Sequence, residues 1–267
     1  MEKLNIDQVH QRLLGIAKEL DRICVSHRIP YYMIGGTMLG AIRHKGFIPW
    51  DDDMDFGIPR EYFEMFIQIC HQELKYPYQL RNYKNSVYGI AFYKIEDCTT
   101  LVDDPCIIQG KESSIGINID VFPLERCFAQ SDNFIRCFKK KEVLSRLKQL
   151  LFYESTKPTL SKSFLRFVSR KLLFFLTEKA MIEKIDEIAR SVNNRGGDSL
   201  VNFYGIYKKK EIIPLKIWGE PKKYIFEDTK LMGVSDYDCF LTHLYGDYMQ
   251  LPPKEKRHIH CDNIYVK

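Results

Sequence analysis

The alternation of its sequence patterns predicts that this chain of 267 residues is an α/β (α+β) protein, with a mixed sheet flanked by helices. Residues 6–27 carry apolar side chains at helical spacing, and Tyr31–Ile34 follows as a short apolar strand. After a second helix, strand-like alternation dominates as far as residue 125. We therefore expect a catalytic core over residues 1–125. Residues 126–267 are expected to form a mainly helical insertion and C-terminal extension packed on that core.

Local signals set the boundaries within the core. Pro30 ends the first helix, and Thr37 is suited to cap the next one, Met38–His44, through its hydroxyl group. Pro59 and Arg60 open a helix over residues 60–74. The expected strands alternate apolar and polar residues. They are Met54–Ile58, Tyr78–Arg81, Val87–Ile95, Thr100–Asp103 and Ile115–Phe122, the last ending at Pro123.

Beyond residue 125 the pattern becomes helical. Amphipathic segments cover Phe134–Phe152, residues 162–179 and residues 178–193. Residues 200–267 have no regular period, and we expect an irregular, mixed segment there.

Composition favours a soluble globular protein, with 45% hydrophobic and 28% charged residues. The net charge of +5 is too mild to indicate a nucleic-acid binder, although it suits an anionic substrate or a membrane surface. The eight cysteines form no CxxC pair and are expected to be reduced. The N-terminus lacks the features of a secretory signal, and no apolar run reaches the ~20 residues that a membrane span needs. These features predict a cytoplasmic protein.

An acidic cluster just after a glycine turn carries the chemical signal. Asp51, Asp52, Asp53 and Asp55 place four carboxylates within five residues. Such carboxylates repel one another and need a cation nearby. Upstream, Gly35-Gly36-Thr37 is suited to receive phosphate oxygens on backbone N–H groups at a helix N-terminus. Together the two features predict a phosphate ester and a divalent metal in one site, and hence phosphoryl or nucleotidyl transfer.

Asp53 and Asp55 are the expected metal pair. Residues two apart on a strand point to the same face, and Mg²⁺ is often held by one or two carboxylates plus substrate phosphates. A solvated acidic turn is the alternative. Asp51 and Asp52 are expected to support the pair or to be solvated.

Further charged residues extend this site. Asp120 interrupts an apolar strand, so we favour a metal ligand or general base over a carboxylate satisfied by backbone donors. Arg43 and Lys94 are expected to contact phosphate oxygens, although Lys94 could equally be a surface lysine. His44 and Lys45 could form an exposed basic helix end instead.

Two other segments have competing interpretations. Residues 162–179 combine a Phe/Leu face with basic residues, which suits either a membrane interface or a core-packed helix. The run His258-Ile259-His260-Cys261-Asp262 offers zinc-binding atoms but has no partner pair, so a substrate-contacting tail or plain surface is preferred.

The stretch Gly35–Asp55, GGTMLGAIRHKGFIPWDDDMD, closely resembles the signature of the LicD family of phosphocholine transferases. The C-terminal segments Leu244–Met249 and Leu251–Arg257 are also similar to that family's ending. The family has a nucleotidyltransferase-type fold and is distantly similar to fukutin and fukutin-related protein. By position, Asp53, Asp55 and Asp120 fall on its metal-binding carboxylates, and Gly36 and Thr37 on its phosphate turn.

This resemblance implies transfer of phosphocholine from CDP-choline to a sugar hydroxyl, with release of CMP. The implied acceptor is a lipid-linked glycan precursor of teichoic acid or lipopolysaccharide, and the implied metal is Mg²⁺. The stretch from Gly36 to Asp53 is longer than in simple nucleotidyltransferases, and the insert Arg43–Trp50 within it is expected to form a wall of the donor pocket.

The choline headgroup needs aromatic faces. Candidates are Trp50, Tyr88, Tyr204 and Trp218, although core packing is the default role of each. Two other functions remain open. One is transfer of ribitol phosphate or glycerol phosphate from a CDP donor, and the other is a catalytically silent scaffold that binds a partner or membrane.

Overall fold

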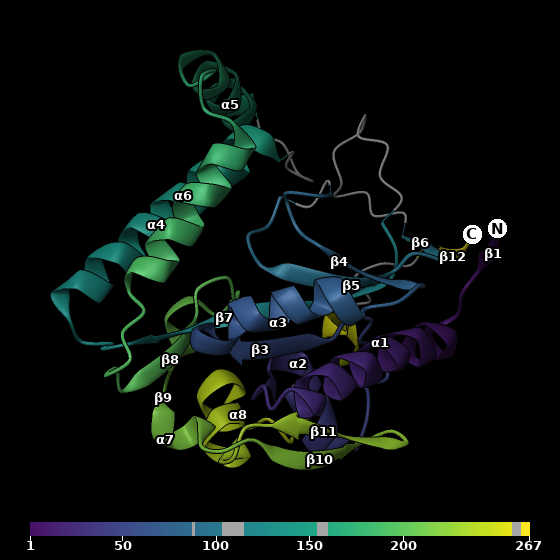
Figure 1. Ribbon diagram of the computed structural model, residues 1–267. Helices are drawn as coiled ribbons and strands as arrows, with labels where there is room; N and C mark the ends of the chain where they lie inside the picture. The colour runs from purple at the N-terminus through teal and green to yellow at the C-terminus, as the bar shows by residue number, and fades with distance from the viewer. Residues whose placement is uncertain (87–88, 103–114, 154–159, 258–262) are drawn as a thin grey trace.

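The computed structural model describes residues 1–86, 89–102, 115–153, 160–257 and 263–267 (Figure 1). Among these residues, nine strands form one mixed sheet. Along the main path of the sheet, the strand order is β10-β11-β2-β3-β7-β5-β4, and β8 pairs with both β7 and β9. The strands are β2 (Tyr32–Met33), β3 (Asp55–Pro59), β4 (Tyr78–Arg81), β5 (Tyr93–Asp97), β7 (Asn118–Cys127), β8 (Ser199–Asn202), β9 (Ile212–Pro214), β10 (Lys222–Phe226) and β11 (Thr229–Gly233). The fold is thus the predicted mixed α/β arrangement.

The two chain ends lie side by side (Figure 1). There β1 (Glu2–Lys3) pairs antiparallel with β12 (Ile264–Val266), and β12 pairs with β6 (Thr100–Val102). This small sheet joins the beginning and end of the described chain.

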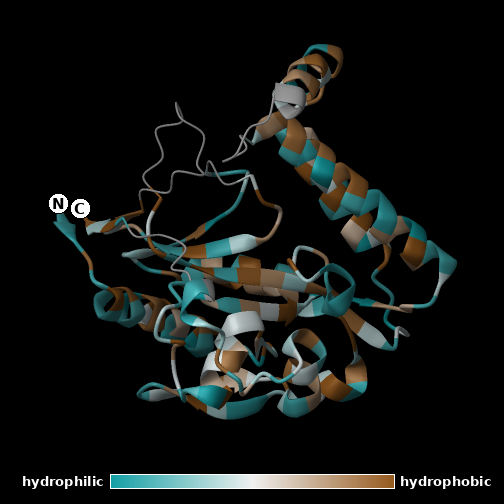
Figure 2. Cartoon of the chain, turned by 180° about the vertical axis from the view of Figure 1, so that it is seen from behind, coloured by the Kyte–Doolittle hydropathy of each residue, from teal (hydrophilic) through white to brown (hydrophobic). Residues whose placement is uncertain are grey.

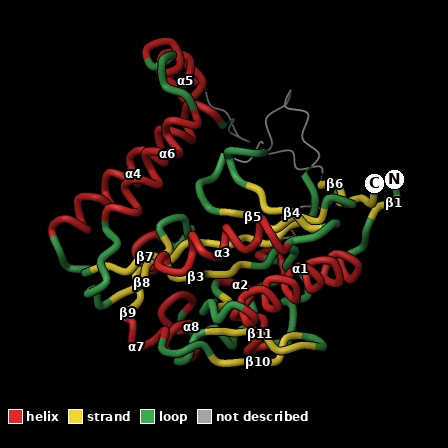
Figure 3. Tube along the Cα trace, viewed as in Figure 1, coloured by secondary structure: helices red, strands yellow, loops and turns green. Residues whose placement is uncertain are grey.

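Helices α1 (Ile6–Ser26) and α3 (Arg60–Glu73) contact each other and the sheet (Figure 3). Asn5 and Gln8 form a capping box that fixes the start of α1, and the fully buried Leu13, Ile16 and Leu20 form its apolar stripe. Helix α2 (Gly35–Arg43) packs on β10 and on α8 (Tyr237–Tyr245), while α7 (Leu215–Trp218) also contacts α8. Short 3₁₀ turns cover Lys208–Glu211 and Lys254–Lys256.

An arm of three helices projects from the sheet (Figure 1). Helices α4 (Asp132–Phe152) and α6 (Glu178–Ser191) pack along each other, and α5 (Leu160–Leu172) lies at the far end. A second apolar cluster sits at the root of this arm, where Phe134 and Phe138 of α4 pack edge-on against the fully buried Phe203.

Several boundaries differ from the predictions. The helix expected over residues 162–179 ends at Leu172, and α6 starts after a turn. The strand expected over Val87–Ile95 begins only at Tyr93 and runs on to Asp97, and residues 87–88 lie outside the described part. Residues 200–267 are more regular than expected, because β10 and β11 pair as an antiparallel hairpin that extends the sheet.

Pro123 does not end its strand, because β7 continues to Cys127. On one side β7 pairs in parallel with β3 throughout this stretch. On the other side, its antiparallel pairing with β5 ends at Val121 and that with β8 begins at Leu124. The Asp120 N–H donates to the Met54 carbonyl oxygen, on the β3 side of the strand. Because successive backbone N–H groups of a strand point to opposite sides, the nitrogen of Pro123 points away from β3, between the end of the β5 pairing and the start of the β8 pairing. Proline therefore costs no hydrogen bond at this position.

No helix in the described part of the chain combines the length and apolar character needed to cross a membrane. Hydrophobic residues nevertheless reach the end of the arm, where brown and teal residues alternate along α5 in Figure 2.

Candidate active site

Strand pairing brings the predicted carboxylates together. The parallel register of β3 and β7 sets Asp55 beside Asp120. Asp51 and Asp53 approach from the segment just before β3, and all four line one cavity of about 430 Å³. Asp53 is exposed, whereas Asp51, Asp55 and Asp120 are partly buried. A strand pairing between distant segments thus converts two sequence motifs into one acidic site.

The Gly-Gly-Thr segment forms the neighbouring wall, in a different manner from that expected. Helix α2 begins at Gly35, which has φ +54°, and Ile34 stands at its N-cap position without a side-chain hydrogen bond. Thr37 therefore does not cap the helix. Its hydroxyl oxygen accepts a hydrogen bond from the Asp55 N–H at 2.8 Å, which ties α2 to the start of β3.

Both glycines leave room for carboxylates. A Cβ at Gly36 would lie 2.7 Å from an Asp51 carboxylate oxygen, and one at Gly35 would lie 3.1 Å from an Asp55 carboxylate oxygen. Side chains at these two positions would push the acids away from the wall. The turn is therefore matched to the acidic cluster as well as to a phosphate.

The surroundings of Asp55 disfavour the ionised form of its carboxyl group. Burial raises the pKa of Asp55 well above its ordinary value, and the charges of Asp53, Asp120 and Asp51 raise it further. The Lys94 ammonium acts in the opposite direction. A cation in the cavity would relieve this repulsion.

Lys94 contacts Asp120 directly, in an ion pair across the β5–β7 register. Its ammonium group also donates to the Asn118 side-chain oxygen at 2.9 Å. The Lys94 ammonium group thus contacts one of the site carboxylates, and its contact with a substrate phosphate stays a prediction.

The carboxylate oxygens of the cavity are suited to bind a hard divalent cation. Carboxylate oxygens are the ligands that Mg²⁺ prefers. Among the described residues, no three His, Cys, Asp or Glu side chains form a ready-made metal cluster. Mg²⁺, however, commonly takes one or two carboxylates and completes its shell with water and substrate phosphates. Asp53 and Asp55 would hold it in that way, with Asp120 close to them.

Arg43 and Trp50 lie outside the acidic cavity, in an adjoining groove that shares Leu39, Ile48 and Tyr245 with it. Arg43 donates to the Tyr248 carbonyl oxygen at 2.9 Å and so holds the C-terminal segment. The Arg257 guanidinium lies 4.5 Å from the Trp50 ring centre. The structure does not support the expected contact of Arg43 with phosphate in the acidic cavity, nor the placing of Trp50 in a choline cage there.

Within the segment Arg43–Trp50, Ile48 lines the cavity, as expected of a pocket wall. Phe47 anchors the segment, since its ring stacks on His10 at 4.1 Å and packs edge-on against Phe226 at 4.9 Å.

An aromatic wall faces the acids. Of the four aromatic residues expected there, Tyr204 and Trp218 line the cavity, and Tyr88 lies outside the described residues. Trp218 is buried in the core, where its ring packs edge-on against Tyr32 and Phe240. Sequence reasoning missed five further aromatic residues that line the cavity. They are Phe92, Phe122, Tyr207, Phe240 and Tyr245.

Signals for three of these residues were present in the sequence. Phe122 follows Asp120 by two residues, and Phe92 precedes Lys94 by two, so each shares a face with a predicted site residue. Their rings lie 4.3 Å apart. Tyr245 belongs to the C-terminal Leu244–Met249 motif, and its hydroxyl lies 3.3 Å from that of Tyr207.

Glu211 is a cavity carboxylate that sequence reasoning did not identify, and no motif marks it. One of its carboxylate oxygens accepts a hydrogen bond from the Tyr207 N–H at 3.2 Å. Burial raises its pKa from the ordinary value of 4.5 to about 7, against smaller lowering effects of this hydrogen bond and of Lys141. It is therefore an acid poised to lose its proton near neutral pH.

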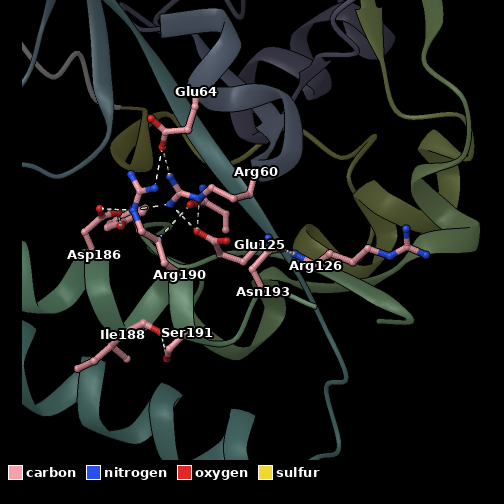
Figure 4. Close-up of polar contacts among 11 residues, drawn as sticks. Arg60, Glu64, Glu125, Arg126, Asp186, Ile188, Arg190, Ser191 and Asn193 are labelled. Atoms are coloured by element: carbon pink, nitrogen blue, oxygen red, sulfur yellow. Dashed lines mark hydrogen bonds and ion pairs between the residues drawn. The ribbon is translucent and has the colours of Figure 1, made fainter. Parts of the chain in front are cut away.

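A network of ion pairs with Arg60 and Glu125 at its buried centre lies beside the aromatic wall, and Figure 4 shows its charged members. The Tyr204 hydroxyl donates to Asp186 of α6 at 2.8 Å. Arg60 of α3 binds both Asp186, at 3.3 Å, and the fully buried Glu125 of β7. Arg190 of α6 lies 2.7 Å from Asp186 and from Glu64. The root of the arm and the cavity wall are thus parts of one polar network.

Comparison with known proteins agrees with this geometry. Residues 28–124 match the family described as LicD/FKTN/FKRP, nucleotidyltransferase domain. Over the full length of both proteins, the chain is 28% identical to the lipopolysaccharide cholinephosphotransferase LicD of Haemophilus influenzae. An uncharacterized protein of Rickettsia typhi is 37% identical over 79 residues, which are 30% of this chain and 25% of that protein. One of Rickettsia prowazekii is 43% identical over 49 residues, 18% of each chain.

Proposed function

Because residues 28–124 match the nucleotidyltransferase domain described as LicD/FKTN/FKRP, we propose that the chain is a cholinephosphotransferase of the LicD family. It moves phosphocholine from CDP-choline to a sugar hydroxyl of a cell-surface glycan precursor and releases CMP. The acceptor is of the lipopolysaccharide or teichoic acid type and is lipid-linked, so the reaction takes place at the inner face of the cell membrane. The full-length similarity to a lipopolysaccharide cholinephosphotransferase supports this proposal.

One observation carries the proposal: a single cavity joins a carboxylate cluster to an aromatic wall. A CDP-alcohol has a pyrophosphate, which a Mg²⁺ ion held by the carboxylates would bind. When the alcohol is choline, it also has a quaternary ammonium that matches the aromatic wall. Such an ammonium cannot donate hydrogen bonds and is attracted to aromatic faces. Ribitol or glycerol would instead favour a pocket lined with polar groups.

Transfer forms one phosphorus–oxygen bond and breaks another. The acceptor oxygen attacks the phosphorus of phosphocholine, and the bond from that phosphorus to the CMP oxygen breaks, its electron pair leaving with CMP. Asp120, oriented by Lys94, accepts the hydroxyl proton. Asp53 and Asp55 hold Mg²⁺, which when bound neutralises charge on the pyrophosphate. The N-terminus of α2 at Gly35-Gly36 receives phosphate oxygens on its N–H groups.

We assign the headgroup subsite to the wall residues Phe92, Phe122, Tyr207 and Tyr245, with Glu211 as the counter-charge. Burial raises the pKa of both Tyr207 and Tyr245, and the charges of Glu211 and Asp55 raise it further. The Tyr207 N–H donates to Glu211, its hydroxyl lies 3.3 Å from that of Tyr245, and the Tyr245 hydroxyl would lie 4.0 Å from a Cβ at Gly35. This order matches a donor whose phosphates and ammonium lie at opposite ends.

A donor panel tests the proposal. Purified protein with Mg²⁺ and a lipid-linked glycan extract is incubated with CDP-choline, CDP-ethanolamine, CDP-glycerol or CDP-ribitol, and CMP release is measured. We expect release with CDP-choline, and reduced or no release with the others. Equal or faster release with CDP-glycerol or CDP-ribitol would assign a different headgroup. No release with any donor, under conditions where the protein binds Mg²⁺, would favour a silent scaffold.

A further inference from the structure

The end of the helical arm is unusually apolar for a surface. We call residues 163–179 the arm tip, which comprises most of α5, the following turn and the start of α6. Of the five exposed phenylalanines in the described part of the chain, four belong to it. The exposed fraction of the side chain is 69% for Phe164, 57% for Phe167, 82% for Phe174 and 65% for Phe175. Leu165 and Leu172 are also exposed. A soluble protein rarely leaves such a patch without a partner.

Contacts with α4 orient this helix. Arg166 donates to the Leu150 carbonyl oxygen at 3.2 Å, and Arg170 to the Leu151 carbonyl oxygen at 2.7 Å. These bonds satisfy carbonyl groups at the C-terminal end of α4, which otherwise have no partner within their helix. Arg166 and Arg170 therefore attach one side of α5 to the end of α4, while Phe164 and Phe167 stay exposed.

Charge at the arm tip is predominantly positive. It carries Arg166, Arg170, Lys171 and Lys179 and a single acid, Glu178. The Lys171 ammonium lies 4.7 Å from the centre of the Phe167 ring, so cationic and aromatic groups are interleaved. Phenylalanines that reach the acyl boundary beside basic residues at headgroup level are typical of a segment that lies in a membrane interface. A protein partner would not require this mixture.

We propose that the arm tip docks on an anionic lipid surface. This inference goes beyond the transferase function and does not depend on it. Apolar side chains at 164, 167, 174 and 175 enter the interface, and Lys171 and Lys179 bind anionic headgroups. Because the arm projects away from the sheet (Figure 1), the tip reaches a bilayer without involving the cavity.

Vesicle binding by the full chain tests this proposal. The protein is floated with vesicles of phosphatidylcholine containing phosphatidylglycerol and, separately, with phosphatidylcholine alone. The variant F174S/F175S removes two exposed rings, and K171E/K179E reverses two charges. The control I225S/M249S removes two exposed apolar side chains elsewhere on the surface. Thermal melting confirms that each variant is folded, and light scattering without lipid reports self-association.

We expect the wild type and the control to bind the anionic vesicles alike, and each tip variant to bind at least about tenfold more weakly. Binding should weaken with added salt and on removal of phosphatidylglycerol. Equal binding by wild type and F174S/F175S would overturn the proposal. The proposal would also be overturned if the wild type were a dimer in lipid-free solution and F174S/F175S were a monomer, because a second copy of the chain would then cover the patch. Neither measurement involves CDP-choline, so a failure here would leave the donor assignment intact.

Discussion

At the residue scale, the proposed function divides the acids of the cavity into those that would bind phosphate through a metal and one, Glu211, that would bind the headgroup. Asp53 belongs to the first group. The variant Asp53→Asn keeps the shape of the side chain but removes its charge, and transfer should fall at least about a hundredfold. CMP release measures the loss, and an unchanged melting temperature shows that the fold persists. Asp52→Asn, a change in a neighbouring acid outside the cavity lining, is the matched control. Full activity of Asp53→Asn would remove Asp53 from the metal pair.

Glu211 should give the donor site a dependence on pH. Its neighbours include Tyr207 on its own segment, Lys141 of α4 and Tyr245 of α8, and its pKa is about 7. Below that pH the carboxyl is neutral, so the KM for CDP-choline should rise as pH falls through 7. Glu211→Gln should raise the KM at pH 8 about tenfold, equivalent to about 1.4 kcal/mol, with little change in kcat. Glu183→Gln, on the exposed side of α6, is the control.

Folding stability offers an independent readout for the same carboxyl. Because its folded pKa is raised above the ordinary 4.5, the stability that it contributes is full below 4.5 and is lost as pH rises to about 7. Relative to the wild type, Glu211→Gln should therefore gain up to roughly 3 kcal/mol between pH 4.5 and 8. Urea unfolding at several pH values measures this difference. A difference that does not change with pH would contradict the burial of an ionising carboxyl at this position.

At the element scale, the buried pair of Arg60 and Glu125 joins α3 to β7 and, through Asp186, to the arm. Within the described part of the chain, one oxygen of Glu125 has no hydrogen-bond partner, and burial raises the pKa of its carboxyl group. Arg60→Met should lower the free energy of unfolding by about 3–5 kcal/mol, because Glu125 then remains buried without its cation. The double variant Arg60→Met/Glu125→Met should recover most of that loss. Arg22→Met breaks exposed ion pairs and should cost less than about 1 kcal/mol. Similar losses in the two single variants would show that burial of the pair is not decisive.

Sequence patterns predicted elements whose signal is local, and they failed where a distant partner decides. The capping box of α1 and the apolar stripe of that helix are local, and its predicted bounds agree with the structure to within one residue. Pro123 was predicted to end a strand. Only the switch of neighbour from β5 to β8 explains why it does not. Thr37 looked like a helix cap, yet its hydroxyl accepts from Asp55, eighteen residues away.

The same distinction applies to the candidate site. Asp53, Asp55 and Asp120 were chosen from short motifs, and the β3–β7 register places them in one cavity. Glu211 lies on a 3₁₀ turn without a motif, and only the tertiary fold brings it there. Arg43 was chosen for its charge, whereas its partners are carbonyl groups of the C-terminal segment. The roles of these residues remain predictions until the variants are measured.

At the scale of the whole molecule, the two proposals together describe an enzyme that works on an acceptor held in a membrane. In these proposals the arm tip contacts the lipid, while the cavity lies at the root of the arm, where the Tyr204 hydroxyl donates a hydrogen bond to Asp186 of α6. If docking concentrates the enzyme at the surface that carries the acceptor, its benefit must depend on how that acceptor is presented.

Two acceptors that differ only in their lipid should therefore separate docking from chemistry. With a water-soluble glycan fragment, F174S/F175S should release CMP at the wild-type rate, because positions 174 and 175 lie away from the cavity. With the lipid-linked glycan in anionic vesicles, at limiting vesicle concentration, the same variant should be about tenfold slower. The difference should disappear at saturating vesicle concentration, since docking changes the fraction of enzyme bound and not its kcat. Equal slowing on both acceptors would mean that the arm tip acts on the cavity through the fold, and that membrane docking is not its role in the reaction.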